Sequence, residues 1–133
     1  MPDTVPVRIL VVDDDEAVRD AVCDVVTMLG YAAEPASDPG DALERFRPGR
    51  YGLVVTDLSM PVMNGLQFAR HLRVLEPALP ILIFSGAAPW TEPSLESIGF
   101  ASARKPDLDA LTRLITRTLD PSERAHAGRE GQG

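Results

Sequence analysis

The chain carries short apolar runs that each stop at a polar residue, and this repeated pattern constrains the fold most. The run Arg8–Val12 is aliphatic and β-branched, and it stops at the acidic triplet Asp13–Asp15. Three later runs have the same form: Leu53–Thr56, Ile81–Phe84 and the weaker Ala101–Arg104. Short continuous apolar runs are typical of strands buried on both faces of a sheet. The pattern therefore predicts a sheet that is covered by helices on both sides.

The segments between these strands have the periodicity of amphipathic helices. Glu16–Leu29 carries apolar residues at helical spacing, and Gly30 follows it as the capping residue. Asp38 and Pro39 favour the start of a second helix. The other expected features are a weak strand at Tyr31–Ala36, an end of the second helix near Phe46, a helix with Leu66, Ala69, Leu72 and Leu75 inward, and a last helix at Leu108–Leu119 with Leu111, Ile115 and Leu119 inward. Strands that alternate with helices predict an α/β fold with a doubly wound parallel sheet.

Length and composition indicate one soluble domain. We expect the domain to occupy residues 1–120 and a polar, flexible tail to occupy residues 121–133. A net charge of −7 argues against a nucleic-acid-binding surface, and no apolar run is long enough to span a bilayer. Cys23 is the single cysteine, which excludes an internal disulfide. No secretory signal is visible, so we expect a cytoplasmic location and no membrane partner.

Chemically active side chains stand where the predicted strands end. They are Asp13 and Asp14 after the first strand, Asp57 after the third, Ser85 after the fourth and Lys105 after the fifth. We expect them to meet at one edge, because ligands of such sheets bind at the carboxyl ends of the strands. Clustered carboxylates repel one another, and a hard divalent cation such as Mg²⁺ removes that repulsion. Together with Lys105, the only lysine among thirteen basic residues, the set predicts a site for in-line phosphoryl transfer.

Four motifs follow one another at intervals that span a whole domain. They are Ile9–Asp15, Asp57–Gly65, Ser85-Gly86 and Lys105-Pro106. On these motifs the chain resembles the receiver domains of response regulators in two-component signalling, including chemotaxis regulators. The resemblance covers about Arg8–Leu119, and it implies a flavodoxin-like, five-stranded parallel sheet with the strand order 2-1-3-4-5.

The resemblance also implies a role for each matched residue. Asp57 would accept a phosphoryl group from a phosphohistidine, Lys105 would pair with Asp57 and then with the phosphoryl oxygen, and Ser85 would hydrogen-bond that group. The implied Mg²⁺ ligands are Asp14, Asp57, the carbonyl of Ser59 and, through water, Asp13. The donor would be a sensor histidine kinase or a histidine phosphotransfer protein. The chain would not be an enzyme in the usual sense, since it would catalyse only its own phosphorylation and dephosphorylation.

Two features depart from the family pattern. Receivers usually carry tyrosine or phenylalanine three residues before the strand-five lysine, and Ser102 stands there instead. Phe100 lies two residues earlier and is expected on the same side of the strand, at a different depth. Pro89 and Pro93 leave room only for a short or irregular fourth helix near Ser94–Ile98. We therefore expect output through this segment, which also holds the only tryptophan, without the usual aromatic switch.

Other functions fit the residues less well. A receiver-like docking module that works without phosphorylation stays open, although Asp57 and Lys105 argue against it. A phosphatase of the haloacid dehalogenase type needs a second aspartate two residues after the nucleophile, where this chain has Ser59. A flavodoxin-like nucleotide binder needs a hydroxyl- or glycine-rich loop after the first strand, where this chain has three carboxylates.

The short segment after the last predicted helix limits how the protein could pass on a signal. About a dozen polar residues follow the last predicted helix, so we expect no effector domain there. Output is then expected from binding an unidentified protein target, or from onward relay of the phosphoryl group, rather than from DNA binding. A homodimer stays open as a further assembly. Met1 favours a stand-alone product over an excised fragment.

Overall fold

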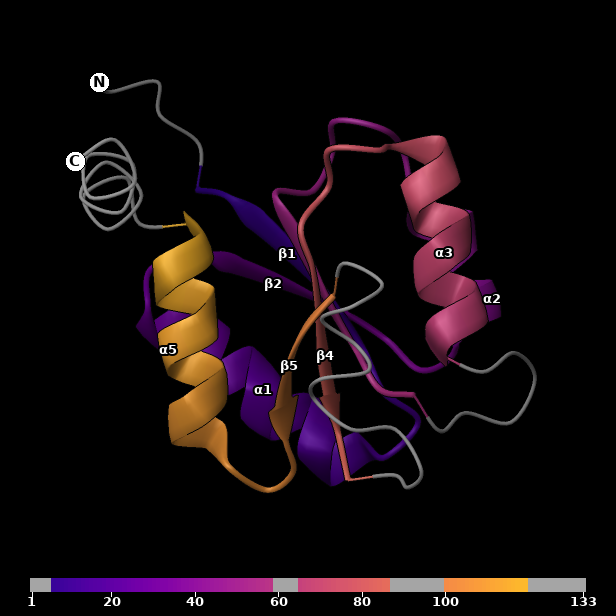
Figure 1. The fold of residues 1–133 in the computed structure, drawn as a ribbon. Helices are drawn as coiled ribbons and strands as arrows, with labels where there is room; N and C mark the ends of the chain where they lie inside the picture. The colour runs from indigo at the N-terminus through magenta and orange to yellow at the C-terminus, as the bar shows by residue number, and fades with distance from the viewer. Residues whose placement is uncertain (1–5, 59–64, 87–99, 120–133) are drawn as a thin grey trace, which may run out of the picture.

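Strands and helices alternate along the chain as the sequence predicts. The computed structural model describes residues 6–58, 65–86 and 100–119 (Figure 1). Its elements are β1 Arg8–Val12, α1 Glu16–Met28, β2 Ala32–Ala36, α2 Pro39–Arg45, β3 Leu53–Thr56, α3 Gly65–Leu75, β4 Ile81–Ser85, β5 Ala101–Arg104 and α5 Leu108–Leu119. All strand pairs are parallel, and the sheet order is β2-β1-β3-β4-β5. The expected fold class and strand order are therefore confirmed.

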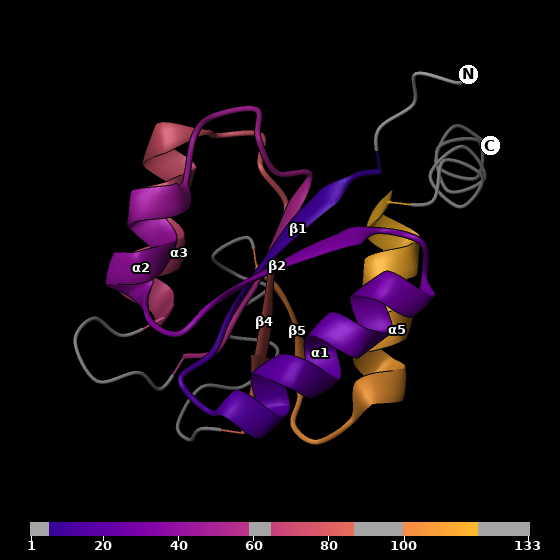
Figure 2. The same cartoon turned by 180° about the vertical axis from the view of Figure 1, so that it is seen from behind.

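The sheet separates two apolar layers, because alternate residues of each buried strand face opposite sides. On one side Val11, Val55 and Phe84 pack against α1 and α5. On the other side Leu10 and Val54 pack against α2 and α3. Figures 1 and 2 show α1 beside α5 on one face of the sheet, and α2 beside α3 on the other. This double cover explains why β1, β3 and β4 are almost continuously apolar rather than alternating.

The helix starts follow from polar caps. The carboxylate of Asp15 accepts hydrogen bonds from the backbone N–H groups of Ala17 and Val18, and that of Asp38 accepts one from Asp41. These bonds satisfy donors that have no partner inside the helix. Gly30, just after the C-cap of α1, has φ of +96°, a conformation that glycine adopts at little cost. Asp15 thus caps α1, whereas Asp13 and Asp14 directly follow the end of β1.

Some expectations need correction or lie outside the described residues. Leu75 was expected inward, but it is 43% exposed, as the last residue of α3. The expected turn near Ser94–Ile98 lies outside the described residues, as do Pro89 and Pro93 and the tail after residue 119. Within the described part of the chain, no helix has the length and apolar character needed to cross a membrane.

The position of the missing aromatic residue is filled by a small polar side chain. Ser102 lies in β5, and its hydroxyl is buried without a hydrogen-bond partner among the described residues. Phe100 is buried just before β5, in the core layer next to α3. The guanidinium of Arg73, from α3, lies 4.8 Å from the centre of the Phe100 ring. Phe100 is therefore held beneath an α3 cation.

Candidate functional site

The predicted residues meet at the carboxyl edge of the sheet, where β1, β3 and β5 end. Asp13 follows β1, Asp57 follows β3, and Lys105 follows β5. Oxygen atoms of Asp13, Asp14 and Asp57 all lie within 4.8 Å of one another. The sheet order explains this meeting, since β1 pairs directly with β3 and both strands run the same way.

Hydrogen bonds fix both the backbone and the side chain of Asp57. Its own N–H donates to the carbonyl of Val12, and the hydroxyl of Thr56 donates to its carbonyl. One carboxylate oxygen, Oδ1, accepts a hydrogen bond of 2.7 Å from the N–H of Leu58. The residue is only 6% exposed. This leaves a fixed carboxylate with Oδ2 facing the other charged groups.

Lys105 bridges two carboxylates. Its Nζ lies 2.8 Å from Oδ2 of Asp13 and 3.1 Å from Oδ2 of Asp57. Burial by itself would lower the pKa of Lys105, but the hydrogen bonds to Asp13 and Asp57 outweigh it and raise that pKa. The ammonium therefore stays charged. The sequence predicted the pairing with Asp57, and the shorter contact to Asp13 was missed.

The two acidic residues after β1 differ in environment. Asp13 is 3% exposed, whereas Asp14 is exposed to solvent. Burial raises the pKa of Asp13, and hydrogen bonds from Lys105 and from the N–H of Asp15 only partly oppose that effect. The carboxylate of Asp57 adds to the rise through repulsion. Among the described residues, Lys105 is thus the cation that faces three neighbouring carboxylates. Their hard oxygen donors match the preference of Mg²⁺.

The turn that carries these carboxylates is tied to α1 by an arginine. The Nη1 of Arg19 donates a hydrogen bond of 2.9 Å to the backbone carbonyl of Asp13. The sequence motifs did not predict this contact for Arg19. Its spacing of six residues from Asp13 places it one helical turn beyond the cap, which was the available signal.

Gly65 lets α3 approach the backbone of Asp57 and Leu58 closely. A Cβ at this position would overlap the carbonyl oxygen of Asp57 and would lie 2.6 Å from the Cα of Leu58. The N–H of Gly65 donates a 2.8 Å hydrogen bond to the carbonyl of Leu58. Only glycine fits so close to this backbone. The resemblance pointed to this residue within its motif, and the structure supplies the reason.

Ser85 and Ser59 stand differently in the structure. Ser85 ends β4 and is half-buried, and its carbonyl accepts a hydrogen bond from the backbone N–H of Lys105. It therefore lies beside the strand that carries the lysine. Ser59, the predicted carbonyl ligand of Mg²⁺, lies outside the described residues, and so does Pro61. Cys23 is partly buried on α1, and His71 is an exposed residue of α3.

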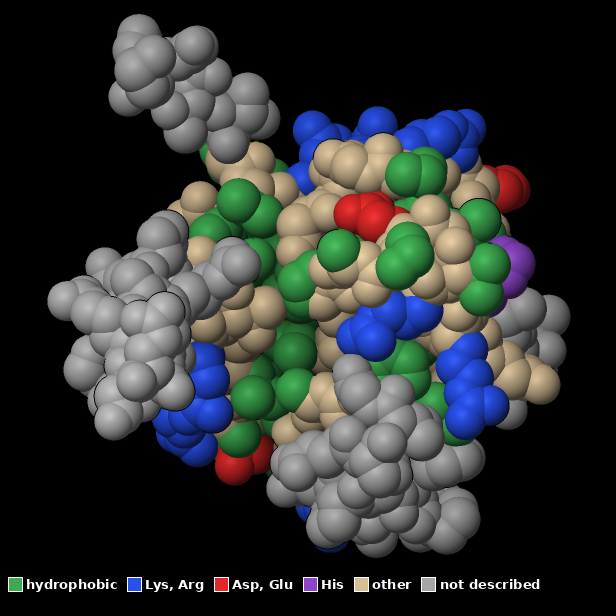
Figure 3. All heavy atoms as spheres, turned by 45° about the horizontal axis from the view of Figure 1, so that its top comes forward, with side chains coloured by type: hydrophobic (Ala, Val, Ile, Leu, Met, Phe, Trp, Pro, Cys, Tyr) green, Lys and Arg blue, Asp and Glu red, His purple; other side chains and the backbone are tan. Residues whose placement is uncertain are grey.

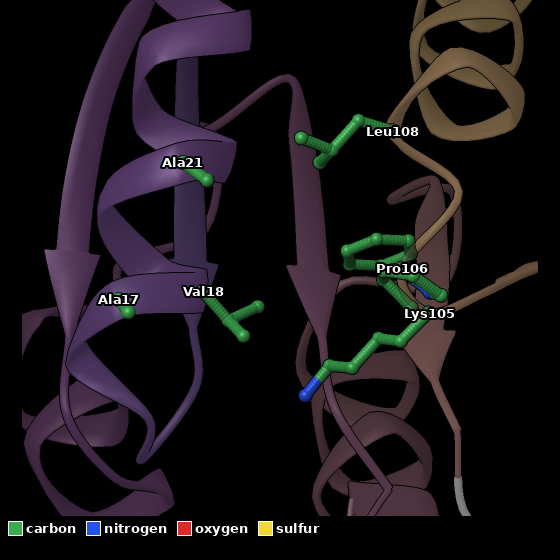
Figure 4. A pocket seen from close by; sticks show the side chains of 7 residues that line it. Ala17, Val18, Ala21, Lys105, Pro106 and Leu108 are labelled. Atoms are coloured by element: carbon green, nitrogen blue, oxygen red, sulfur yellow. The ribbon is translucent and has the colours of Figure 1, made fainter.

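A small apolar pocket borders the site on the α1 side. It has a volume of about 200 Å³ and is lined by Ala17, Val18, Ala21, Phe84, Lys105, Pro106 and Leu108. Figure 4 shows residues of α1 facing the Lys105–Leu108 turn across this pocket, with the lysine nitrogen at one side. The peptide bond between Lys105 and Pro106 is cis. The charged site thus adjoins an apolar surface.

A second charged cluster lies at the amino ends of β1 and β3, far along the strands from the first. Glu34 of β2 contacts Arg8, Arg45 and Arg50 at 3.1, 3.8 and 3.2 Å and accepts a hydrogen bond from the hydroxyl of Tyr51. Burial would raise the pKa of Glu34, but the Tyr51 and arginine hydrogen bonds outweigh it and lower that pKa. Figure 3 turns the amino ends of the strands forward and shows Lys and Arg side chains gathered along the upper edge of that face.

Comparisons with known proteins agree with this geometry. The family model of the response regulator receiver domain matches residues 9–96. The response regulator MprA of Mycolicibacterium vanbaalenii is 44% identical over 80 residues, which are 60% of this chain and 35% of that protein. MprA of Mycobacterium tuberculosis is 42% identical over 79 residues, 59% of this chain and 34% of that protein. The chain therefore spans about a third of the length of these curated relatives.

Solved structures show the same fold. A CheY-like receiver domain protein from Methanospirillum hungatei has a TM-score of 0.77 at 27% identity, covering 91% of this chain and 99% of that one. TrrA from Thermotoga maritima, in complex with Mg²⁺ and BeF, has a TM-score of 0.75 at 26% identity, covering 85% of this chain and 99% of that one. With the acidic cluster and its lysine at the carboxyl edge, these matches show that the chain belongs to the response regulator receiver domain family.

Proposed function

We propose that Asp57 accepts a phosphoryl group from a phosphohistidine, and that the protein works as a cytoplasmic receiver in a phosphorelay. The observation that carries this proposal is the position of Asp57, a buried carboxylate 3.1 Å from Lys105 and within 4.8 Å of two further carboxylates. The donor is a sensor histidine kinase or a histidine phosphotransfer protein.

The residues divide the work of transfer. Oδ2 of Asp57 attacks the phosphorus atom, so that a P–O bond forms while the P–N bond to the donor imidazole breaks. The imidazole leaves with the electron pair of the broken bond and takes up a proton. Lys105 moves from the carboxylates to a phosphoryl oxygen, and the hydroxyl of Ser85 donates to the same group. Such fixed donors stabilise charge as it develops on the oxygens.

The acidic edge fits a resident Mg²⁺. Asp14 and Asp57 would hold it directly, with the carbonyl of Ser59, and Asp13 would hold it through water. When bound, the ion neutralises phosphoryl charge and offsets the repulsion among the carboxylates. The closeness of the oxygen atoms of Asp13, Asp14 and Asp57, all within 4.8 Å of one another, supports this assignment.

The apolar pocket between α1 and the Lys105–Leu108 turn suits the approach of the donor. It is lined by small or aliphatic side chains, including Ala17, Val18 and Pro106, and it adjoins the lysine (Figure 4). A helix of the donor that packed there would bring its histidine over the site. Output then passes to a protein target, whose contact face we place on residues 87–100.

Intact mass after incubation with acetyl phosphate and Mg²⁺ tests the proposal. The wild-type protein is expected to gain one phosphoryl group, and Asp57→Asn is expected to gain none. Asp109→Asn, which changes an exposed aspartate of α5, is the matched control and should be labelled like the wild type. A phosphoryl adduct that persists in Asp57→Asn would overturn the assignment. Absence of any adduct from acetyl phosphate and from a phosphohistidine donor would favour the phosphorylation-independent docking module.

A further inference from the structure

Arg19 reaches back from α1 to a backbone carbonyl that neither the sheet nor the helix uses. β1 ends at Val12, and the backbone hydrogen bonds of α1 begin with the N–H of Arg19 donating to the carbonyl of Asp15. The carbonyl of Asp13 lies between these two systems. Among the described residues, its hydrogen-bond partner is the guanidinium of Arg19, at 2.9 Å. A carbonyl of a buried residue without such a partner would be costly.

Arg19 is therefore attached to the acidic turn at two points. Its backbone N–H bonds to Asp15 at 2.9 Å, and its side chain bonds to Asp13 at the same distance. Between these points Oδ1 of Asp13 accepts a 2.9 Å hydrogen bond from the N–H of Asp15. The three bonds enclose the turn that presents Asp13 and Asp14.

The hydrogen-bond partner of Arg19 is informative, because α1 also carries carboxylates with which a guanidinium can form an ion pair. Glu16, Asp20 and Asp24 lie on the same helix, yet within the described ranges Arg19 forms no ion pair. Its charge is directed to the base of the acidic turn instead. Repulsion among three carboxylates tends to open that turn, and the Arg19 contact opposes the opening.

We propose that Arg19 is a positioning residue for Mg²⁺, which holds the Asp13–Asp14 turn in the geometry that faces Asp57. This inference rests on the proposed function, since it concerns the same site. Groups that orient metal ligands affect metal affinity strongly, by about 10- to 100-fold on removal. We expect Arg19→Met to raise the Kd for Mg²⁺ by about tenfold.

The test is a titration of the full chain with Mg²⁺ alone. Binding is measured by calorimetry and by the amide NMR shifts of Asp13–Asp15. Arg113→Met removes an equal charge from an exposed position on α5, and its Kd should stay near the wild-type value. The double variant Arg19→Met/Asp20→Asn restores the net charge but not the hydrogen bond. We expect its Kd to stay raised, because the missing contact and not the missing charge weakens binding.

Several results would overturn the inference. One is a Kd for Arg19→Met within about twofold of the wild type, a difference smaller than any positioning effect. Another is recovery of the wild-type Kd when Asp20→Asn is added. Denaturant unfolding without Mg²⁺ confirms that each variant is folded; if Arg19→Met is not, Arg19→Gln, whose side chain is too short for this contact, takes its place with the same expected result.

The outcome also separates this inference from the proposed function. A wild-type protein that binds no Mg²⁺ and gains no phosphoryl group would remove both. A wild-type protein that binds Mg²⁺ and is phosphorylated, alongside an Arg19→Met variant with the same Kd, would remove only the role of Arg19.

Discussion

The two charged clusters of the sheet have opposite compositions. At the carboxyl edge, the cation that contacts Asp13 and Asp57 among the described residues is Lys105, with Asp14 close by. At the amino ends, Glu34 is one carboxylate in contact with three arginines and Tyr51. The first cluster raises the pKa of a carboxyl group, and the second lowers one. Both lie at the ends of the same strands.

The difference separates a site for binding from a structural tie. The pKa of Glu34 is lowered because its charged form is well paired, so this cluster stabilises the fold at neutral pH. The pKa of Asp13 is raised mainly by burial, which the hydrogen bonds from Lys105 and Asp15 only partly offset, so its ionised form lowers the stability of the folded state at neutral pH. A functional site often lowers the stability of the folded state in this way.

Removal of the single ammonium should have the largest effect. Lys105→Met leaves Asp13 and Asp57 without their cation, and the rate of phosphorylation by acetyl phosphate should fall about 100-fold, as for loss of one fixed donor to a transition state. The time course of intact mass measures this rate. Arg104→Met, an exposed neighbour that loses the same charge, is the control. Equal rates for Lys105→Met and the control would show that Lys105 has no special role.

Removal of the central carboxylate should destabilise the other cluster. Glu34→Gln leaves three arginines facing a neutral amide, and the free energy of unfolding should fall by about 2 kcal/mol. Urea unfolding measures it, with the exposed Glu44→Gln as control. Because the folded pKa of Glu34 is below the ordinary 4.5, its contribution should be lost as the pH falls below 4.5. A wild-type and a Glu34→Gln protein with identical acid dependence would contradict this account.

The opposite sign is expected at Asp13. Its folded pKa lies above 3.8, so the ionised form destabilises the native state as the pH rises through that folded pKa. Asp13→Asn removes the buried charge and should raise the free energy of unfolding at pH 7 by about 1 kcal/mol in the absence of Mg²⁺. The same variant should bind Mg²⁺ more weakly. Asp24→Asn, on the exposed face of α1, is the matched control. A lower free energy of unfolding in Asp13→Asn than in the wild type would contradict this difference between the two clusters.

The smallest effect concerns a buried polar group with no charge. The hydroxyl of Ser102 has no partner among the described residues, unlike every group in the Glu34 cluster. Ser102→Ala should therefore raise the free energy of unfolding slightly, by about 0.5 kcal/mol. Urea unfolding measures the change, and the exposed Ser37→Ala should be neutral. A clear loss of stability in Ser102→Ala would mean that this hydroxyl has a partner in solution.

Sequence predicted the elements that depend on local pattern. The strands at Arg8–Val12, Leu53–Thr56 and Ala101–Arg104 have the expected bounds. In the first two, burial on both faces leaves a continuous apolar signal. The meeting of Asp13, Asp57 and Lys105 was also predictable, since parallel strands bring their carboxyl ends together. The environment of Leu75 was not, because helical spacing shows which face is apolar and not where along the helix that face stops being covered.

The sequence pattern does not predict contacts between side chains that lie far apart along the chain. Arg8, Glu34 and Arg50 are ordinary charged residues in separate segments, and only the pairing of β1, β2 and β3 brings them together. The contact between Arg73 and Phe100 has the same origin, since it joins α3 to the start of β5. No spacing rule connects such residues, because their neighbourhood is created by the fold.

The solitary lysine gives this chain a built-in spectroscopic handle. Reductive methylation with ¹³C-formaldehyde modifies lysine amines and the chain terminus, so a single side-chain resonance would come from Lys105. Its methyl groups would sit between Asp13 and Asp57, where the ammonium now lies. The chemical shift of that one signal would follow the ionisation and occupancy of the acidic edge directly, with no assignment of the remaining spectrum.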